Sequence, residues 1–124
     1  MLHIMLVTGR PQAMSPFIEA LRSDAEVHLE CFTSGADVLN AARAASAQLV
    51  VVDSLLPDEE PLGLVSKLIR INAMVNTAVV SPLTEEEFHQ ASEGLGVLGR
   101  LPEKPGSGDA SELMRKLRKL LGQC

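Results

Sequence analysis

A carboxylate, a hydroxyl and an amine follow three of the candidate strands in this chain. Asp53 ends the apolar run 49–52, Ser81 follows the run 77–80, and Lys104 comes after a third candidate strand. In an open parallel sheet, ligands and chemistry gather outside the carboxyl ends of the strands. The sequence therefore predicts that these three side chains converge on one small pocket.

The first candidate strand, residues 2–7, ends without an acid. It is followed by Thr8, Gly9 and Arg10. A metal-dependent phosphoryl-transfer site would need a carboxylate here, because Mg²⁺ is held by one or two carboxylates together with waters and phosphate oxygens. Asp53 alone is a poor ligand set for this ion. We therefore expect Mg²⁺ to bind weakly at Asp53 or not at all.

Two basic residues supply positive charge in place of a metal. Arg10 directly follows the turn after the first strand, which predicts a guanidinium group near Asp53. Lys104 is expected to form a structural ion pair with Asp53 rather than to act in catalysis. Thr8 is expected to satisfy backbone groups at the tight turn.

Length and composition limit the classes of protein to consider. The chain has 124 residues, which predicts a single domain over 1–124, and 46% of them are hydrophobic, enough for a substantial core. With three Phe and no Trp or Tyr, the chain has no stacking platform for single-stranded nucleic acid. The formal net charge of −5 repels phosphate backbones. No nucleic-acid partner is expected.

Cysteine usage and hydropathy predict a cytoplasmic protein. Cys31 and Cys124 lie far apart in the sequence and form no C-x-x-C pair, which favours a reducing compartment. No stretch approaches the ~18 to 20 apolar residues of a membrane span, and the first residues carry no basic leader. We expect no membrane contact and no export.

The hydrophobic pattern alternates between strand-like and helix-like periods, which is typical of an α/β sheet with helical crossovers. The second strand alternates apolar and polar residues, which predicts an edge strand with one wetter face. The third strand is apolar on both faces, which predicts a central position. The expected strands cover residues 2–7, 26–31, 49–52, 77–80 and 97–101.

Helix start signals lie between these strands. Pro11 suits the first turn of a helix, Ser34 is a candidate N-cap, and Thr84 with Glu87 forms a candidate capping box. Further helices are expected over 62–71 and from Asp109 to the end of the chain, the last with an apolar stripe and a basic surface.

Other candidate motifs are assigned no function. His3, His28 and His89 lack the sequence spacing of metal ligands. The acidic loop 58–60 could donate a replacement ligand, but a solvated loop is the preferred interpretation. Residues 94–99 match G-x-G-x-x-G, yet a helix precedes them and a strand follows, the reverse of a dinucleotide-binding unit. These glycines are expected to end the helix and turn the chain.

Over essentially its whole length the chain resembles the receiver domain of two-component response regulators. The resemblance lies in Asp53-Ser54-Leu55-Leu56-Pro57, in Ser81 at the end of the fourth strand, and in Lys104-Pro105 after the fifth. It implies a flavodoxin-like three-layer α/β/α fold with a five-stranded parallel sheet in the order 2-1-3-4-5. It also implies Asp53 as phosphoacceptor, with Ser81 and Lys104 contacting the phosphoryl group.

The sequence departs from the family pattern at two places. Receivers of this family place two adjacent acids after the first strand, where this chain has Thr8 and Gly9, followed by Arg10. The family usually carries Tyr or Phe at the switch position, where this chain has Leu101. The metal pocket is therefore expected to be altered. The same holds for the switch residue, whose movement reports phosphorylation in the family.

Two functions are compatible with these observations, and neither is enzymatic. In the first, the chain is a phosphorelay receiver in which a histidine kinase phosphorylates Asp53 despite the degenerate Mg²⁺ site. In the second, it is a pseudo-receiver that binds an output protein or dimerises without phosphorylation. A flavodoxin-like cofactor binder is a third, less favoured class, because the chain has no aromatic residue suited to stack on a flavin.

The resemblance places the interaction surface on the fourth helix, the fifth strand and the fifth helix. Met114 and Leu121 are expected to be exposed apolar positions there, beside the basic residues Arg115, Arg118 and Lys119. Acidic residues 85–87 offer complementary charge on a second copy, so a homodimer through this face is one expectation. The sequence names no cognate kinase or pathway.

Overall fold

Strands and helices alternate along the chain, as the periodicity predicts. A computed structural model describes residues 1–122. The strands are β1 (Leu2–Val7), β2 (Val27–Phe32), β3 (Leu49–Val52), β4 (Asn76–Val80) and β5 (Gly99–Leu101). The helices are α1 (Ser15–Arg22), α2 (Gly35–Ala44), α3 (Pro61–Ile71), α4 (Glu85–Ala91) and α5 (Ser107–Leu120).

The sheet has five strands in the order β2-β1-β3-β4-β5, and every neighbouring pair is parallel. Its flavodoxin-like order confirms the expected fold. β3 lies in the centre and all its residues are fully buried, whereas β2 lies at an edge and none of its residues is. Both strand placements follow from the hydrophobic patterns, because only a central strand must be apolar on both faces.

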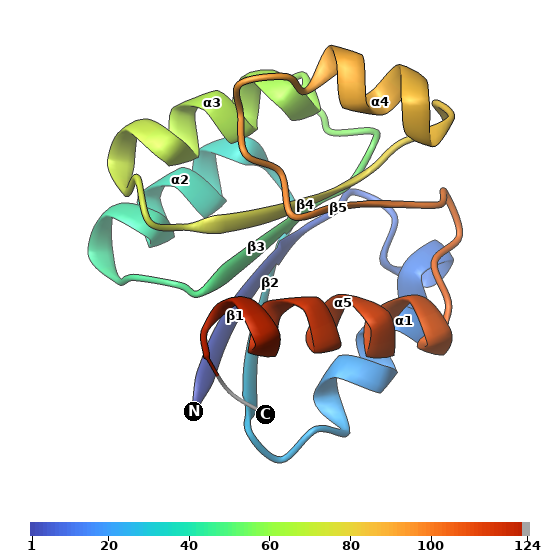
Figure 1. Cartoon of the computed structure of the whole chain (residues 1–124). Helices are drawn as coiled ribbons and strands as arrows, with labels where there is room; N and C mark the ends of the chain where they lie inside the picture. Colours follow the sequence, from blue (N-terminus) through green and yellow to red (C-terminus); the bar gives the residue numbers. More distant parts are fainter. Residues whose placement is uncertain (123–124) are drawn as a thin grey trace.

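Helices cover both faces of the sheet (Figure 1). Even-numbered residues of β1, such as Ile4 and Leu6, pack into a core with α1 and α5. Odd-numbered residues, such as Met5 and Val7, pack into a second core with α2, α3 and α4. Alternation along each strand therefore divides the apolar residues between two layers, with the sheet between them.

Most of the expected helix starts are confirmed. The Ser34 hydroxyl accepts a hydrogen bond from the N–H of Asp37 at 3.2 Å, and Thr84 with Glu87 forms a full capping box. Pro11 differs from the prediction, because it begins a short 3-10 helix, Pro11–Met14, before α1. The helix α1 itself starts at Ser15 with a second proline in its first turn.

The chain between α4 and β5 is longer than expected. α4 ends at Ala91, and β5 begins at Gly99 rather than at residue 97. Gly94 and Gly96 lie in this connection with φ of 85° and 63°. Residues with a side chain rarely adopt this left-handed conformation, so these glycines turn the chain as expected. Within residues 1–122, no helix combines the length and apolar character needed to span a membrane.

Candidate functional site

Asp53 follows the central strand β3 at the carboxyl edge of the sheet. Its N–H donates to the carbonyl of Val7 at 3.0 Å, which continues the β1–β3 pairing beyond the strand. The residue is completely buried, with 0% exposure. A buried carboxylate is costly unless charged and hydrogen-bonding partners surround it.

Arg10 is the charged partner of Asp53. Its Nη2 lies 2.8 Å from Oδ1, and its Nε lies 3.0 Å from Oδ2. The guanidinium group thus faces both carboxylate oxygens, in the two-pronged geometry that favours arginine over lysine. The same Nη2 donates to the carbonyl of Glu103 at 2.7 Å, which ties the loop after β5 to the end of β3.

Two further donors complete the environment of the carboxylate. The hydroxyl of Thr8 donates to Oδ2 of Asp53 at 2.5 Å, and the N–H of Ser54 donates to Oδ1 at 2.7 Å. The Thr8 hydroxyl also accepts from the N–H of Arg10 at 3.0 Å, as the predicted role at the turn requires. Both oxygens of Asp53 are therefore satisfied by the protein itself.

Electrostatics hold the guanidinium group in its charged form. The hydrogen bonds to Asp53 raise the pKa of Arg10 above its usual value, although partial burial opposes that shift. The Arg10 side chain is 26% exposed while Asp53 is fully buried. Arg10 therefore covers the Asp53 carboxylate, and of these two side chains only Arg10 is exposed to water.

Lys104 does not form the expected ion pair with Asp53. It is exposed, and in the described part of the chain it makes no ion pair. The physical reason is that Arg10 already neutralises Asp53 and bonds the carbonyl of the neighbouring Glu103. Arg10 lies beside Asp53 as predicted, whereas the predicted ion pair of Lys104 with Asp53 is wrong.

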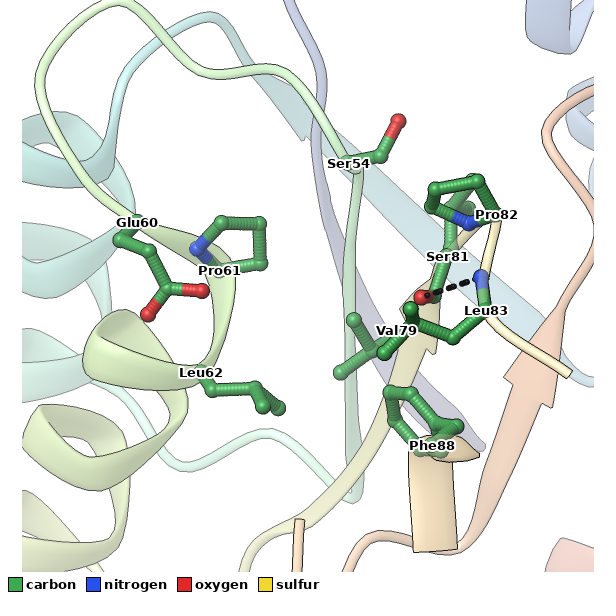
Figure 2. Close-up of a pocket in the computed structure, with 10 residues that line it drawn as sticks. Ser54, Glu60, Pro61, Leu62, Val79, Ser81, Pro82, Leu83 and Phe88 are labelled. Atoms are coloured by element: carbon green, nitrogen blue, oxygen red, sulfur yellow. Dashed lines mark hydrogen bonds between the residues drawn. The ribbon is translucent and has the colours of Figure 1, made fainter. Parts of the chain in front are cut away.

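Ser81 lies at the end of β4, 7% exposed, beside a cavity of about 220 Å³ (Figure 2). Its hydroxyl accepts a hydrogen bond from the N–H of Leu83 at 3.2 Å, drawn as the dashed line in Figure 2. The cavity is lined by Ser54 and by apolar side chains that include Leu62 and Phe88. Asp53 and Arg10 do not line it, so the predicted convergence is only partial.

The residues present do not fit a Mg²⁺ ion. Thr8 offers a hydroxyl already bonded to Asp53, and Gly9 offers no side chain at all. The guanidinium group of Arg10 lies on both oxygens that a metal would use, and it repels a divalent cation. In this arrangement both carboxylate oxygens of Asp53 contact a protein cation, Arg10.

Leu101, at the position where the resemblance implies a switch residue, is buried in the core on the α1 and α5 side of the sheet, 4% exposed. It carries no hydroxyl and contributes to packing. The aromatic side chain that the resemblance implies at this position is replaced by a buried leucine.

The acidic loop 58–60 is structural rather than merely solvated. The Asp58 carboxylate accepts from the N–H groups of Gly35 and Ala36 at 2.9 and 3.0 Å, and these bonds lower the pKa of Asp58. Glu60 caps α3 by accepting from the N–H of Gly63. The loop thus joins the starts of two helices and donates no ligand to the site of Asp53.

A cluster of two histidines and a glutamate was not predicted from the sequence. His3, His28 and Glu30 lie together on the edge strand β2 and its neighbour β1. Linear spacing hides this cluster, because parallel pairing brings His3 opposite His28 although 24 residues separate them in the sequence. Aligning the two predicted strands in parallel register is the signal that would have found it. Cys124 lies outside the described residues.

The fold has many known counterparts, although sequence comparison finds none. No protein-family model matches the chain, and no curated protein matches it either. The chemotaxis response regulator CheY4 of Vibrio cholerae has a TM-score of 0.82 at 15% identity, covering 94% of this chain and 98% of that chain. The receiver domain of RcsB from Salmonella enterica serovar Typhimurium has a TM-score of 0.81 at 14% identity, covering 95% and 88%.

A third similar structure comes from a protein of unassigned function. It is the N-terminal domain of an uncharacterized protein from Wolinella succinogenes, with a TM-score of 0.81 at 16% identity, covering 98% of this chain and 97% of that chain. These similarities and the strand order show that the chain has the flavodoxin-like fold of response regulator receiver domains.

Proposed function

We propose that this chain is a pseudo-receiver: a signalling module of receiver fold that acts by protein contact and does not depend on phosphorylation of Asp53. The observation that carries the proposal is the contact of the Arg10 guanidinium with both oxygens of the buried Asp53 carboxylate. The structural neighbours are signalling modules, which favours a role in signal transduction for this chain as well.

Arg10 opposes phosphorylation in two ways. Attack on a phosphodonor needs a free carboxylate oxygen, and here both oxygens are engaged by Arg10, Thr8 and Ser54. Transfer of the phosphoryl group also depends on a metal to neutralise the developing charge, and the contacts of Arg10 with both oxygens disfavour binding of that metal. The guanidinium group of Arg10 occupies the space beside the Asp53 carboxylate that an incoming phosphoryl group would need.

The test is incubation of the protein with Mg²⁺ and a small phosphodonor, followed by intact mass spectrometry. We expect no mass increase of one phosphoryl group, while a receiver with the full acid pair, treated in parallel, is phosphorylated. A mass increase that disappears in Asp53→Asn would overturn the proposal. It would establish Asp53 as the phosphoacceptor that the resemblance implies.

The protein contact is proposed to use the face formed by α4, β5 and α5, with a second copy of the chain as the first candidate partner. The structure corrects two residues assigned to this face. Met114 is buried at 5% exposure, and Arg118 is paired with Asp24 at 2.5 Å. Residues better suited to the contact are Lys116, beside β5, and the exposed Leu120 at 59%.

The acidic end of this face is also partly used within the chain. Glu85 pairs with Arg100 at 3.3 Å, and Glu87 accepts from the N–H of Thr84 in the capping box. The exposed Glu86 remains available as a complement to the lysines of α5. Charge complementarity between two copies is thus proposed to rest on Glu86 together with Lys116 and Lys119.

Charge reversal of Lys116 and Lys119 together is expected to weaken self-association at least tenfold, as measured by analytical ultracentrifugation. These exposed lysines form none of the ion pairs seen within residues 1–122, so their reversal leaves the fold intact. Arg70→Glu on α3 is the matched control and is expected to associate like the parent. Unchanged association of the lysine variant would place the contact on another face.

A further inference from the structure

A second group of chemically active side chains lies at the other end of the sheet from Asp53. His3 comes from β1, and His28 and Glu30 come from the edge strand β2. Parallel pairing places His3 beside His28 and Met5 beside Glu30. Because side chains alternate along a strand, His28 and Glu30 lie on the same face, which is the face of α2.

The ligand atoms of the cluster point toward one another. One ring nitrogen of each histidine and one Glu30 carboxylate oxygen all lie within 4.8 Å of each other. The Nε2 of His3 contacts Oε1 of Glu30 directly, and the two imidazole rings have centroids 5.4 Å apart. His28 is exposed while the other two residues are half-buried, so the cluster opens to solvent on one side.

The backbone orients the His3 ring for this contact. The carbonyl of Ser46 lies 3.2 Å from Nδ1 of His3, and a carbonyl can only accept, so Nδ1 carries the hydrogen. The other ring nitrogen, Nε2, faces the carboxylate of Glu30. A cation between these two atoms would contact both of them.

We propose that His3, His28 and Glu30 form a binding site for a zinc-class divalent cation. Two imidazoles and one carboxylate are a ligand set that zinc accepts, with water in the fourth position. The bond from Nδ1 of His3 to a backbone carbonyl is the outer contact that metal-bound histidines usually make. Water would occupy the open side, beside the exposed His28.

The geometry needs only local adjustment to close around the ion. Tetrahedral bonds of about 2.1 Å place ligand atoms about 3.4 Å apart. The present separations reach at most 4.8 Å, and the exposed His28 side chain is free to rotate toward the other two. Binding would fasten the edge strand β2 to β1 by side chains as well as by the backbone ladder.

This site is independent of the pseudo-receiver proposal. Asp53 lies beyond the carboxyl ends of the strands, whereas His3 lies four residues before the end of β1. His3 and the end of β1 at Val7 are therefore about 13 Å apart along the strand. No residue is shared between the two clusters. The result of the zinc titration therefore does not bear on the role of Arg10. The result of the phosphorylation test likewise does not bear on the zinc site.

The test is calorimetric titration of the full chain with Zn²⁺ at neutral pH, together with NMR of the histidine rings. We expect one equivalent to bind, with shifts at the Nε2 side of His3 and at His28 but not at His89. His28→Gln and Glu30→Gln are each expected to weaken binding at least about 10-fold, since even loss of an outer contact to a metal ligand costs about 10- to 100-fold.

The controls distinguish Zn²⁺ binding at this site from nonspecific Zn²⁺ binding to other exposed side chains. His89 on α4 and the free Cys31 are both exposed and lie outside the cluster. His89→Gln and Cys31→Ser are expected to bind Zn²⁺ like the parent. The proposal is wrong if the parent takes up no Zn²⁺ at millimolar concentration, if His28→Gln binds as tightly as the parent, or if either control loses the affinity instead.

Discussion

Replacing Arg10 by methionine is expected to lower the free energy of unfolding by about 3 kcal/mol, the lower end of the range for breaking a buried ion pair. Asp53 is fully buried and would keep only the hydrogen bonds from Thr8 and Ser54. The value falls at the lower end because the Arg10 side chain is 26% exposed, so that water can partly replace it. Urea denaturation of parent and variant measures the change.

Lys104→Met is the matched control, since the family resemblance gives Lys104 the cationic role. It is exposed and unpaired in the described part of the chain, so its removal is expected to change stability by no more than about 0.5 kcal/mol. The reciprocal variant Asp53→Ala is expected to be neutral or to cost up to ~1 to 3 kcal/mol. A clear rise in its melting temperature would contradict the pairing of Arg10 with Asp53.

The sheet could be predicted closely because its signals are local. β1 and β3 have the expected ends, since a run such as 49–52 is apolar on both faces only in a central strand. The region before β5 was predicted less well, because Val97 and Leu98 are apolar in either a strand or a connection. Pairing with β4 decides where β5 begins, and that information is not local.

The candidate site was predicted in its members and in the proximity of Arg10 to Asp53, but the predicted pairing of Lys104 with Asp53 was wrong. Arg10, Thr8 and Asp53 were all identified, because each lies within three residues of the end of a strand. Which cation reaches Asp53 depends on the path of the loop after β5, and there Arg10 bonds the carbonyl of Glu103. The cluster of His3, His28 and Glu30 depends on the register between two strands, which periodicity alone does not give.

Restoring the acids of the family pattern is expected to create a Mg²⁺ site that the parent lacks. The change is the triple variant Thr8→Asp, Gly9→Asp and Arg10→Met. A Cβ at Gly9 would lie 3.7 Å from the carbonyl oxygen of Leu55, an ordinary contact, so aspartate fits there. Mg²⁺ at ten times its dissociation constant would add about 1.4 kcal/mol to the stability of the variant.

The direction of the effect separates a metal site from a general influence of salt. Without Mg²⁺ the triple variant is expected to be less stable than the parent, because carboxylates gather around the buried Asp53 with no cation among them. The matched control carries Asn at positions 8 and 9 with Arg10→Met, and it should not respond to Mg²⁺. Thermal melts with and without the ion measure all three proteins. If Mg²⁺ stabilises the parent as strongly as the triple variant, then Arg10 does not exclude the metal, and the pseudo-receiver proposal loses its physical basis.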